Sequence, residues 1–563
     1  MTHSTTEPAN FTGAAPKAGP MLAADGRPLK KSLARALRRQ KLRALMLVAP
    51  LLIFVLVTFI APIADMLFRS VENQIVSETL PETVMALQEW NGESDIPDAA
   101  YDAIYFDLFT AAEAKQHTRL GTRLNYEQTG ISSLFRTSGR QLDDIGDDVH
   151  DALEDINPAW DEPAPWYQMM NAGDRPVDTA LLDTKMFDMR ALTGEVLEGD
   201  LGFAPAREVS DLLPRTAAAY TSWAIYTALV DGDIVAEEDP WESVFAALAS
   251  DLQSGADVSG YSGPGADMLA EAAANLDALP AVDFRNVMVG IDEDWGALEN
   301  WQTIKLYSPD YTPGYFLNSV DMQNGIDGAQ MRPENERIYI TLFIRTLYLS
   351  LVITGSCILL SYPVAFLLSN LPARSANLLM ILVLLPFWTS LLVRTSAWKV
   401  MLQQQGVIND VLVWLGLVAD DSRLVMINNQ TGTIIAMTHI LLPFMILPMY
   451  SVMSTIPPYY VRAAKSLGAT NWTAFWRVYF PQSIPGIGAG SILVFILAIG
   501  YYITPEIVGG TKGVFISNRI AYHISSSLNW GLAAALGTIL LAVVLILYWA
   551  YDRIVGIDNV KLG

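Results

Sequence analysis

The stretch between residues 457 and 481 carries the residue types and spacing that point most directly to a function. Two prolines at 457–458 suit the entry turn of a short helix. Ala463 and Ala464 give that helix a small face, which a second protein can approach closely. Gly468 can adopt the left-handed backbone conformation that ends a helix. The chemistry on offer is therefore packing and docking rather than catalysis.

A second helix is predicted directly after this glycine. Thr470 or Asn471 can cap its first turn, because both side chains accept hydrogen bonds from free backbone N–H groups. Pro481 is expected to break the helix again before the chain enters the membrane. We name residues 455–484 the coupling loop and expect it to dock in a groove on another protein. Its candidate contact residues are Arg462, Ala463, Ala464, Lys465, Gly468, Asn471 and Pro481.

A second group of candidates consists of aromatic, hydroxyl and acidic residues near the ends of apolar stretches. An ionisable group at membrane depth is costly and often functional, so Glu506 is a candidate contact for a cationic solute; a solvated loop acid is the alternative. Aromatic rings can hold an ammonium group by cation–π attraction, or can form the aromatic belt of a membrane surface. The candidate pathway residues are Trp388, Thr389, Tyr501, Tyr502, Thr504 and Glu506.

Other residues in the apolar stretches have structural interpretations. His439 is expected to be a packed neutral imidazole, and Arg394 is expected to anchor a helix at the membrane interface. The apolar stretches contain no paired acids and no Ser/His/Asp set, so we expect no enzyme there. Cys357 is the only cysteine, which excludes an intrachain disulfide and zinc sites built on several cysteines. Four prolines are predicted to kink helices: Pro363, Pro386, Pro443 and Pro448.

The elements that must position these residues are membrane helices. Of the 563 residues, 52% are apolar and 17% charged, which argues against an ordinary soluble enzyme. A membrane-spanning helix needs about 20 mainly apolar residues, and several long charge-free windows meet this requirement. Six transmembrane helices are predicted, at about 44–67, 342–369, 376–396, 432–454, 485–504 and 529–550.

The lysine and arginine counts near the membrane predict the orientation. Residues 1–43 hold nine bases and two acids, so this tail is expected in the cytoplasm. An even number of spans returns residues 557–563 to the same side. Segments 397–431 and 505–528 are then outside. The coupling loop is inside, which agrees with its three bases and its lack of acids.

Between the first two predicted spans lies an acidic region, residues 69–338. Residues 71–340 contain 50 acids and 14 bases, a net charge of −36, whereas the rest of the chain carries +13. Apolar residues recur there at helical spacing, so we expect a mainly helical domain with its own core. The acid clusters at 143–148 and 292–294 lack the spacing of a calcium-binding EF-hand loop and are interpreted as a solvated face. Such a field can also raise the capture rate of cations.

Two apolar stretches admit a second interpretation. Residues 216–230 are uncharged but only 15 long, so we expect a buried helix of the acidic region rather than a seventh span. Residues 44–68 follow a 43-residue leader, which is too long for a signal peptide, so we expect a retained first helix. Residues 1–26 are rich in Ala, Thr, Pro and Gly and are expected to be disordered.

The coupling loop resembles the "EAA" loop of binding-protein-dependent ABC importer permeases. The shared spacing is Ala-Ala, three residues, Gly, nine residues, then aliphatic-x-apolar-Pro. Arg462 replaces the usual Glu, Val478 replaces Ile and Phe480 replaces Leu. The first change removes any salt bridge made by that Glu and leaves the packing role intact. The residues on family positions are Arg462, Ala463, Ala464, Gly468, Val478, Phe480 and Pro481.

Further segments resemble more narrowly the spermidine/putrescine-type branch of these permeases. They are residues 345–347, 361–368, 385–395, 406–409, 500–505 and 509–510. The resemblance covers about 45–68 and 340–556. It implies an all-α membrane protein with six transmembrane helices of the type I ABC importer permease fold. The acidic region is not covered and would be a large extracytoplasmic insertion between helices 1 and 2.

The resemblance also implies the partners and the activity. The chain would form half of the pathway of an ATP-driven importer for a small cationic solute such as a polyamine. The implied partners are a second permease, ABC ATP-binding subunits, a periplasmic solute-binding protein and the lipid bilayer, with no nucleic acid. No G-x-x-x-x-G-K-[ST] motif occurs, so ATP and Mg would be bound by the partner ATPase, and this chain would hold neither cofactor nor metal.

The predicted organisation has five parts. These are a cytoplasmic basic tail (1–43), transmembrane helix 1 (44–68), an acidic periplasmic insertion domain (69–338), a core of helices 2–6 (339–556) and a cytoplasmic tail (557–563). The leading alternative is an importer for an opine, a phosphonate, an amino acid derivative or iron. A membrane-anchored receptor is the alternative from another class. The short inner loops and tail leave no room for the signalling domain that a receptor would need.

Overall fold

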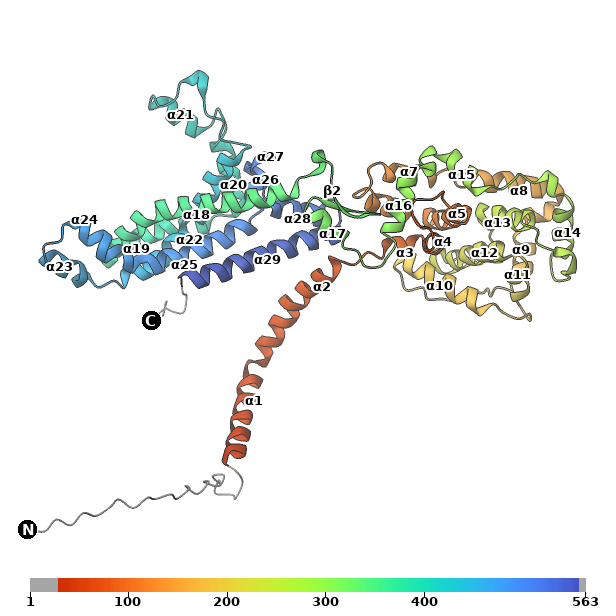
Figure 1. The fold of residues 1–563 in the computed structure, drawn as a ribbon, viewed down its shortest axis with the longest axis horizontal. Coiled ribbons are helices and arrows are strands. Elements are labelled where there is room, and N and C mark those ends of the chain that lie inside the picture. The colour runs from red at the N-terminus through yellow and green to blue at the C-terminus, as the bar shows by residue number, and fades with distance from the viewer. Residues whose placement is uncertain (1–28, 556–563) are drawn as a thin grey trace, which may run out of the picture. The chain divides into compact units, whose positions relative to one another are not determined.

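The computed structural model describes residues 29–555. Helix α1 (Leu29–Val55), the π-helical turn η1 (Leu56–Ile60) and helix α2 (Ala61–Arg69) follow one another without a break (Figure 1). The stretch Gln40–Arg69 is 30 residues long, strongly apolar and without buried residues, which suits a helix surrounded by lipid or by another chain. Residues up to 68 form a unit separate from the rest, and each unit is described by itself.

The apolar region (residues 339–556) consists of helices joined by short loops. Five helical stretches among the described residues are long and apolar enough to span a membrane, or six if one bent pair counts as a span. The elements of the region are α18 (Tyr339–Asn370), α19 (Ala373–Leu384), η8 (Leu385–Trp388), α20 (Leu391–Met401), α21 (Val407–Trp414), η9 (Asp420–Ser422), α22 (Gln430–Ser454), α23 (Pro458–Ser466), α24 (Asn471–Ala474), η10 (Phe475–Tyr479), α25 (Phe480–Gly500), α26 (Ile503–Val508), α27 (Gly510–Gly513), α28 (Ile516–Ser525) and α29 (Trp530–Val555).

Helices α18, α22 and α25 pack against one another and form the core of this region. Glycines on α25 allow the close approach to α22. A Cβ added at Gly486 would lie 3.0 Å from the Cβ of Val452, and one at Gly490 would lie 2.6 Å from the sulfur of Met445. Membrane helices associate through such small residues because the backbones can then come close together.

The third predicted span, 376–396, is not one continuous helix, and the kink predicted at Pro386 is confirmed as a sharp break. The stretch Ala373–Trp388 and helix α20 meet at an angle of 93°. Pro386 lies in the 3-10 turn η8, and the backbone of Thr389 is extended (φ −104°, ψ 147°). Proline has no N–H to continue the α-helical hydrogen bonds, so the helix ends there and restarts in a new direction. The bend places Trp388 and Thr389 at a corner.

The acidic region is mainly helical, as predicted, with one short hairpin in which Met322 pairs with Met331. Its elements are α3 (Ile75–Thr79), α4 (Pro81–Ala86), α5 (Asp98–Glu113), α6 (His117–Leu124), α7 (Ile131–Ser138), α8 (Asp144–Ile156), η2 (Pro158–Asp161), α9 (Pro163–Met170), α10 (Thr179–Thr193), α11 (Arg207–Leu212), α12 (Pro214–Tyr226), η3 (Thr227–Asp231), α13 (Glu242–Gln253), η4 (Val258–Gly260), α14 (Ala266–Ala274), η5 (Leu276–Ala278), α15 (Phe284–Ile291), η6 (Glu293–Gly296), α16 (Leu298–Leu306), α17 (Gly314–Ser319), β1 (Met322–Gly325), β2 (Gly328–Met331) and η7 (Glu334–Glu336).

The acidic region contains the same helical unit twice. Residues 76–90 and 209–223 share the pattern V-S-acid-x-L-P-x-T-x-x-A-x-x-x-W. In both, a short helix ends at a leucine with φ −128°, and the next helix begins at a proline. We call residues 75–170 (α3–α9) the first copy and residues 207–306 (α11–α16) the second copy.

A buried aspartate holds the threonine of this pattern in each copy. Asp107 on α5 accepts hydrogen bonds from the backbone N–H and the hydroxyl of Thr83, both at 2.7 Å. Asp251 on α13 accepts the same two bonds from Thr216, at 2.9 and 2.7 Å. The carboxylate thus satisfies free N–H groups at the start of α4 and α12 in the same way.

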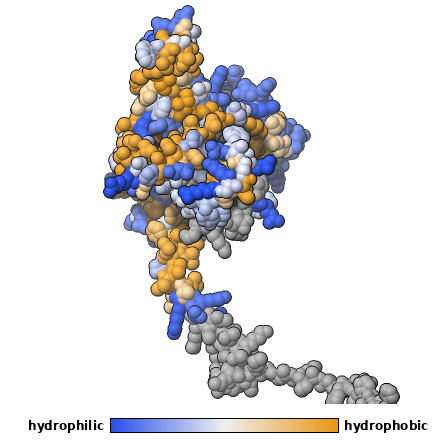
Figure 2. Space-filling model, turned by 90° about the vertical axis from the view of Figure 1, so that its left-hand side faces the viewer, coloured by the Kyte–Doolittle hydropathy of each residue, from blue (hydrophilic) through white to orange (hydrophobic). Residues whose placement is uncertain are grey.

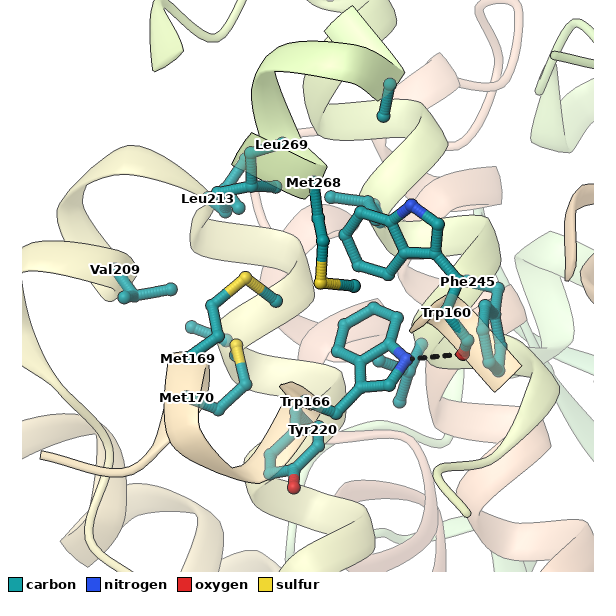
Figure 3. Close-up of a cluster of buried hydrophobic side chains, with 14 of the residues drawn as sticks. Trp160, Trp166, Met169, Met170, Val209, Leu213, Tyr220, Phe245, Met268 and Leu269 are labelled. Atoms are coloured by element: carbon teal, nitrogen blue, oxygen red, sulfur yellow. Dashed lines mark hydrogen bonds between the residues drawn. The ribbon is translucent and has the colours of Figure 1, made fainter. Parts of the chain in front are cut away.

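The second halves of the copies also match. Residues 130–166 and 265–301 have equal lengths, and each begins with a glycine of positive φ, +103° at Gly130 and +80° at Gly265. In the first copy the indole N–H of Trp166 donates to the carbonyl of Trp160 at 3.0 Å (Figure 3). In the second, Trp301 donates to Trp295 at 2.8 Å.

The two copies exchange their last helices. One core combines α8 and α9 of the first copy with α11–α14 of the second (Figure 3). The other combines α15 and α16 of the second copy with α3–α7 of the first. Because neither copy closes its own core, the pair must fold together.

Several contacts among the described residues join the acidic region to the apolar region, and two of them are the following. The carboxylate of Asp321 caps α18 by accepting hydrogen bonds from the N–H groups of residues 338–340 at 2.8–2.9 Å. Tyr315 packs against Leu532 at the start of α29, and its hydroxyl accepts a 2.8 Å hydrogen bond from Arg123. These contacts fix α17 and the hairpin to the ends of two membrane helices.

Residues 216–230 lie in α12 and η3, inside the core of the acidic region, so the prediction of a buried helix rather than a seventh span is confirmed. The predicted disorder of residues 1–26, most of the tail 1–43 and the tail 557–563 lie outside the described residues.

Candidate coupling loop and outer cavity

The coupling loop contains the predicted helix stop. Helix α23 ends in a Schellman motif, in which Ala469 N–H donates to the carbonyl of Ala464 and Gly468 N–H to that of Lys465, both at 3.0 Å. The φ of Gly468 is +91°, and no atom lies within 4 Å of where its Cβ would be. The left-handed backbone conformation, and not crowding around the side chain, therefore favours glycine here.

The second helix starts as predicted but does not break where expected. Thr470 is the N-cap, and its hydroxyl accepts a 3.2 Å hydrogen bond from Thr473 N–H. Asn471 is the first helical residue. The predicted break at Pro481 is wrong, because the helix runs without interruption from Asn471 to Gly500. The π-helical turn η10 ends at Tyr479, and Pro481 is the second residue of α25.

The coupling loop presents apolar side chains to its surroundings. Helix α23 buries none of its residues. Leu467 is 90% exposed and Trp472 is 72% exposed, and Tyr459 and Trp476 are exposed as well. Figure 2, which looks at this end of the bundle, shows apolar surface interspersed with hydrophilic surface. Such a patch rimmed by polar residues is typical of a protein–protein contact.

The charged residues of the coupling loop are all basic and exposed. They are Arg462, Lys465 and Arg477. Ala463 is exposed and Ala464 half-buried, so both small residues lie at the surface of α23. The loop thus offers a small-residue helix with a basic rim, and its partner surface is expected to carry acidic groups.

An aromatic cluster, which the sequence analysis missed, joins this loop to α18. The ring of Phe366 lies 5.1 Å from that of Tyr479 and 5.9 Å from that of Phe475. The hydroxyls of Tyr479 and Ser369 are 3.2 Å apart. The i, i+4 spacing of aromatics at 362 and 366 and at 475 and 479 was the available signal. These contacts pack the loop directly against α18.

The predicted pathway residues at the end of α25 differ in burial, and Tyr501 is half-buried. The fifth predicted span ends at Gly500 rather than at 504, because Tyr501 is extended. Thr504 is fully buried, with its hydroxyl 3.2 Å from that of Thr395. Tyr502 is exposed. Glu506 is exposed and accepts a 2.6 Å hydrogen bond from Asn518.

Trp388 does not join these residues. It is 74% exposed at the bend before α20, and among the described residues no ring contact links it to Tyr501 or Tyr502. The neighbouring Thr389 hydroxyl donates to the carbonyl of Pro386 at 3.0 Å. The three aromatic residues therefore do not form one aromatic cage within this chain.

Tyr502 and Glu506 do line a common cavity of ≈ 630 Å³ between α18, α26 and α28. Its other charged lining residues are Arg337, Arg345 and Arg519. Arg345 donates to the carbonyl of Thr511 at 2.9 Å. Three guanidinium groups against one carboxylate make this outer cavity positive, which disfavours Glu506 as the contact of a free cation.

His439 and Arg394 are the two polar residues of the apolar region for which a structural role was predicted. The Nδ1 atom of His439 accepts a 3.1 Å hydrogen bond from the indole of Trp398, so that nitrogen carries no proton, as expected for a packed neutral imidazole. The Nε atom of Arg394 is buried and has no hydrogen-bond partner among the described residues. The residue as a whole is partly exposed, and its role as an interfacial anchor stays a prediction.

The acid clusters of the acidic region serve local structure. In the 292–294 cluster, Asp292 accepts a hydrogen bond from Asp294 N–H at 3.1 Å and caps η6. In the 143–148 cluster most carboxylates are exposed. Within residues 29–555, no group of three or more His, Cys, Asp or Glu side chains is arranged to hold a metal ion.

Comparison with known proteins gives matches in the apolar region. Residues 357–555 match the family model described as "Binding-protein-dependent transport system inner membrane component". The spermidine/putrescine transport system permease protein PotB of Salmonella typhimurium (strain LT2) is 34% identical over 222 residues, which are 39% of this chain and 77% of that protein. PotB of Escherichia coli K12 is 33% identical, with 39% and 80% covered.

Two further matches are more distant. The inner membrane ABC transporter permease protein YdcU of Escherichia coli K12 is 32% identical over 225 residues, which are 38% of this chain and 71% of that protein. The crystal structure of a bacterial alginate ABC transporter, in complex with a periplasmic protein bound to alginate pentasaccharide, contains a chain with 20% identity and a TM-score of 0.33. The match covers 40% of this chain and 80% of that one.

Proposed function

The chain belongs to the binding-protein-dependent transport system inner membrane component family, and we propose that it forms half of the translocation pathway for a small organic cation such as a polyamine. It is an inner-membrane permease subunit of an ABC importer and not an enzyme. The observation that carries the polyamine proposal is the 34% identity to a spermidine/putrescine permease over 77% of that protein's length.

The partners follow from the same proposal. ATP-binding subunits dock on the coupling loop, bind ATP and Mg, and supply the hydrolysis, while this chain holds no cofactor. The exposed Leu467 and Trp472 and the basic rim support such a contact. A second permease completes the pathway, and a periplasmic binding protein delivers the solute. The acidic region is then a periplasmic domain inserted between the first two transmembrane helices.

The mechanical proposal is that closure of the ATPase pushes α23 and α24. The Schellman turn at Gly468 makes these helices a rigid lever, and the aromatic contacts of Phe475 and Tyr479 with Phe366 pass the displacement to α18. Helices α22 and α25 pack on α18 and move with it. This rocking would alternate the pathway between outward and inward openings.

Transport by the reconstituted importer tests this function. Liposomes holding this chain, its second permease and the ATPase are supplied with the binding protein and ATP. Uptake of radiolabelled spermidine or putrescine is the expected result. Gly468→Pro cannot adopt a φ near +91° and should reduce uptake at least 100-fold with normal membrane insertion. Gly468→Asn tolerates this conformation and serves as the matched control, with uptake near that of the unchanged chain. Normal uptake by Gly468→Pro would contradict the lever.

Labelling of a single cysteine tests the orientation. Ser466 is exposed on α23, so Ser466→Cys in a Cys357→Ala background gives one accessible thiol. We expect an impermeant maleimide to label it only in inverted vesicles. Labelling from outside intact cells would place the coupling loop in the periplasm and contradict the proposal.

A second candidate, a permease for an anionic solute such as a phosphonate, is favoured by one observation. The outer cavity has three arginines and one glutamate. Arg519→Gln should leave polyamine uptake unchanged if the cavity only contacts a partner protein. The second candidate would be favoured by two results together. The unchanged chain would take up an anionic solute and no polyamine, and Arg519→Gln would lose the uptake of the anionic solute.

A further inference from the structure

The acidic region contains a cavity where its two copies meet. The cavity measures ≈ 210 Å³. Helices α3–α5 of the first copy line one side, α12 and α13 of the second copy line the other, and α10 closes it. Small-molecule sites occur preferentially at such junctions between structural units. A water molecule takes up about 30 Å³ of the liquid, so the cavity has room for a molecule of the size of 1,4-diaminobutane.

Carboxylates outnumber cations in this cavity. Its acidic lining residues are Glu78, Glu82, Asp107 and Asp188, and its basic ones are Lys185 and Arg215. Both basic groups are already paired, Lys185 with Glu82 and Arg215 with Asp102 outside the lining. Among the described residues, no ion pair is made by Glu78 or Asp188, and Asp107 has only the hydrogen bonds of residues 82–83. Glu78, Asp107 and Asp188 thus form no direct ion pair, although Lys185 lies close enough to lower the pKa of Asp107 and Asp188, and Arg119 that of Glu78.

Burial destabilises the ionised form of these carboxyl groups, and a bound cation would stabilise it. Desolvation by burial raises the pKa of Asp188 and of Glu78 above the ordinary values. Desolvation raises the pKa of Asp107 to about 8, and the carboxylate of Glu82 adds to it. A carboxylate destabilised by desolvation gains free energy when a positive charge comes close. The cavity therefore attracts cations and repels anions.

The walls between the charges suit an alkyl chain with an ammonium group. Phe106, Met189 and Leu192 are among the lining residues. An aromatic face attracts an ammonium group, and aliphatic side chains pack against methylene groups. Lys185 supplies a direct precedent, because its own alkylammonium enters this cavity from α10 and pairs with Glu82. A tethered primary amine therefore already occupies one end.

We propose that this cavity is a binding site for a small organic cation with primary ammonium groups, separate from the translocation pathway. One ammonium group would lie between Glu78 and Asp188, with its methylene chain along Phe106. The proposal rests on the walls of the cavity and not on the solute that the importer carries. Such a site would sense or retain the cation at the acidic region before transport.

Calorimetry on the purified full chain in nanodiscs, without ATPase or binding protein, tests this site. The titrant is 1,4-diaminobutane at low salt, and 1,4-butanediol is the neutral ligand of equal length. We expect one diamine site and no binding of the diol. Asp188→Asn and Glu78→Gln should each weaken binding at least tenfold. Lys185→Met, which removes the tethered ammonium group, should tighten it several-fold.

Two controls separate this site from other effects. Asp183→Asn changes an exposed carboxylate on the same helix, outside the cavity lining, and should leave the affinity unchanged. Glu506→Gln in the outer cavity should also leave it unchanged. Three outcomes would each overturn the proposal. They are no diamine binding to the unchanged chain, an affinity of Asp188→Asn equal to that of the unchanged chain, and loss of binding in Glu506→Gln alone. Uptake is measured separately, so a failure here leaves the transport function intact.

Thermal unfolding shows whether a variant that binds no diamine is still folded. The diamine should raise the Tm of the unchanged chain and of Asp183→Asn, because a ligand that binds only the folded state stabilises it. It should not raise the Tm of Asp188→Asn. A cavity variant that does not fold would show no cooperative transition, and the half-exposed Asp188 is the position where this is least expected.

Discussion

The two copies in the acidic region share a sequence pattern and its hydrogen bonds but carry opposite charges at one equivalent position. Glu82 in the first copy and Arg215 in the second each stand between the helix-starting proline and the buried threonine. The carboxylate of Glu82 helps to raise the pKa of Asp107, whereas the guanidinium of Arg215 works to lower that of Asp251, which burial raises. The unit therefore depends on its Leu-Pro-x-Thr pattern and its aspartate, and position x is free to serve the cavity.

The comparison is sharpest in the two cores. Trp160 and Trp295 are both fully buried at equivalent positions. Replacement of either by alanine should destabilise the acidic region by about 3–5 kcal/mol, because a large cavity remains. The free energy of unfolding is measured in urea on the full chain, with protease cleavage of the acidic region as the signal for unfolding. Trp414→Ala, which truncates an 83% exposed side chain, is the control. If only one of the two tryptophan replacements lowered the stability of the acidic region, the two positions would not be equivalent.

The stability of the acidic region should depend on pH through the buried Asp107 of the first copy. The folded pKa of Asp107 is about 8, above the unfolded value of about 3.9. The folded state therefore binds the proton more tightly, so stability contributed by protonated Asp107 is present near pH 4 and is lost as pH rises towards 8. The loss is at most about 1.4 kcal/mol per pH unit. The Tm of Asp107→Asn should therefore fall less between pH 5 and pH 8 than that of the unchanged chain.

Two further variants sharpen this test. Glu82→Gln removes the carboxylate that raises the pKa of Asp107, so the loss of stability should be complete at a lower pH. Asp148→Asn changes an exposed carboxylate on α8 and should keep the original pH dependence. An identical pH profile for Asp107→Asn and Asp148→Asn would contradict the role of Asp107.

The threonine hydroxyls should contribute equally in the two copies. Thr83→Val and Thr216→Val keep the side-chain shape but remove one 2.7 Å hydrogen bond to a buried carboxyl group. Each should cost about 0.5–1.5 kcal/mol, because the carboxyl group loses one of its hydrogen bonds and keeps the one from the backbone N–H. Thr184→Val on α10, where the hydroxyl is exposed, is the matched control. Unfolding of the three variants in parallel would show whether the shared pattern has a shared energetic role.

The smallest expected difference concerns the glycines before α7 and α14. Gly130 and Gly265 both have positive φ, so alanine should cost about 1 kcal/mol at either position. A Cβ at Gly265 would lie 3.1 Å from the sulfur of Met169, whereas Gly130 has open space. Gly265→Ala should therefore be the more destabilising of the two by Tm. Equal Tm values would show that Met169 moves aside without cost.

Much of the coupling loop could be predicted from sequence, because its geometry is local. The stop at Gly468 and the cap at Thr470 depend on backbone conformations that a few neighbouring residues determine. The break expected at Pro481 was wrong, because the helix continues through η10, whose Tyr479 packs against Phe366 on α18, and such contacts with a distant helix are not visible in the local sequence. The aromatic cluster was missed for the same reason.

The acidic region shows the opposite balance. Its helical nature was predicted from apolar spacing, and the repeated Leu-Pro-x-Thr pattern at residues 80–83 and 213–216 was available in the sequence. The cavity was not, since its lining comes from residues more than 100 positions apart, such as Glu82 and Lys185. Acid clusters along the chain gave no sign that unpaired carboxyl groups would meet at the junction of the copies.

The sequence by itself determined the apolar stretches, the docking loop, the acidic composition and the resemblance to importer permeases. These features depend on hydrophobic length, local backbone preference and residue spacing, which short segments carry. Only the tertiary structure decided the positive outer cavity around Glu506 and the exchange of helices between the copies. These depend on which distant side chains meet and on whether burial leaves their charges paired, and chain order does not contain that information.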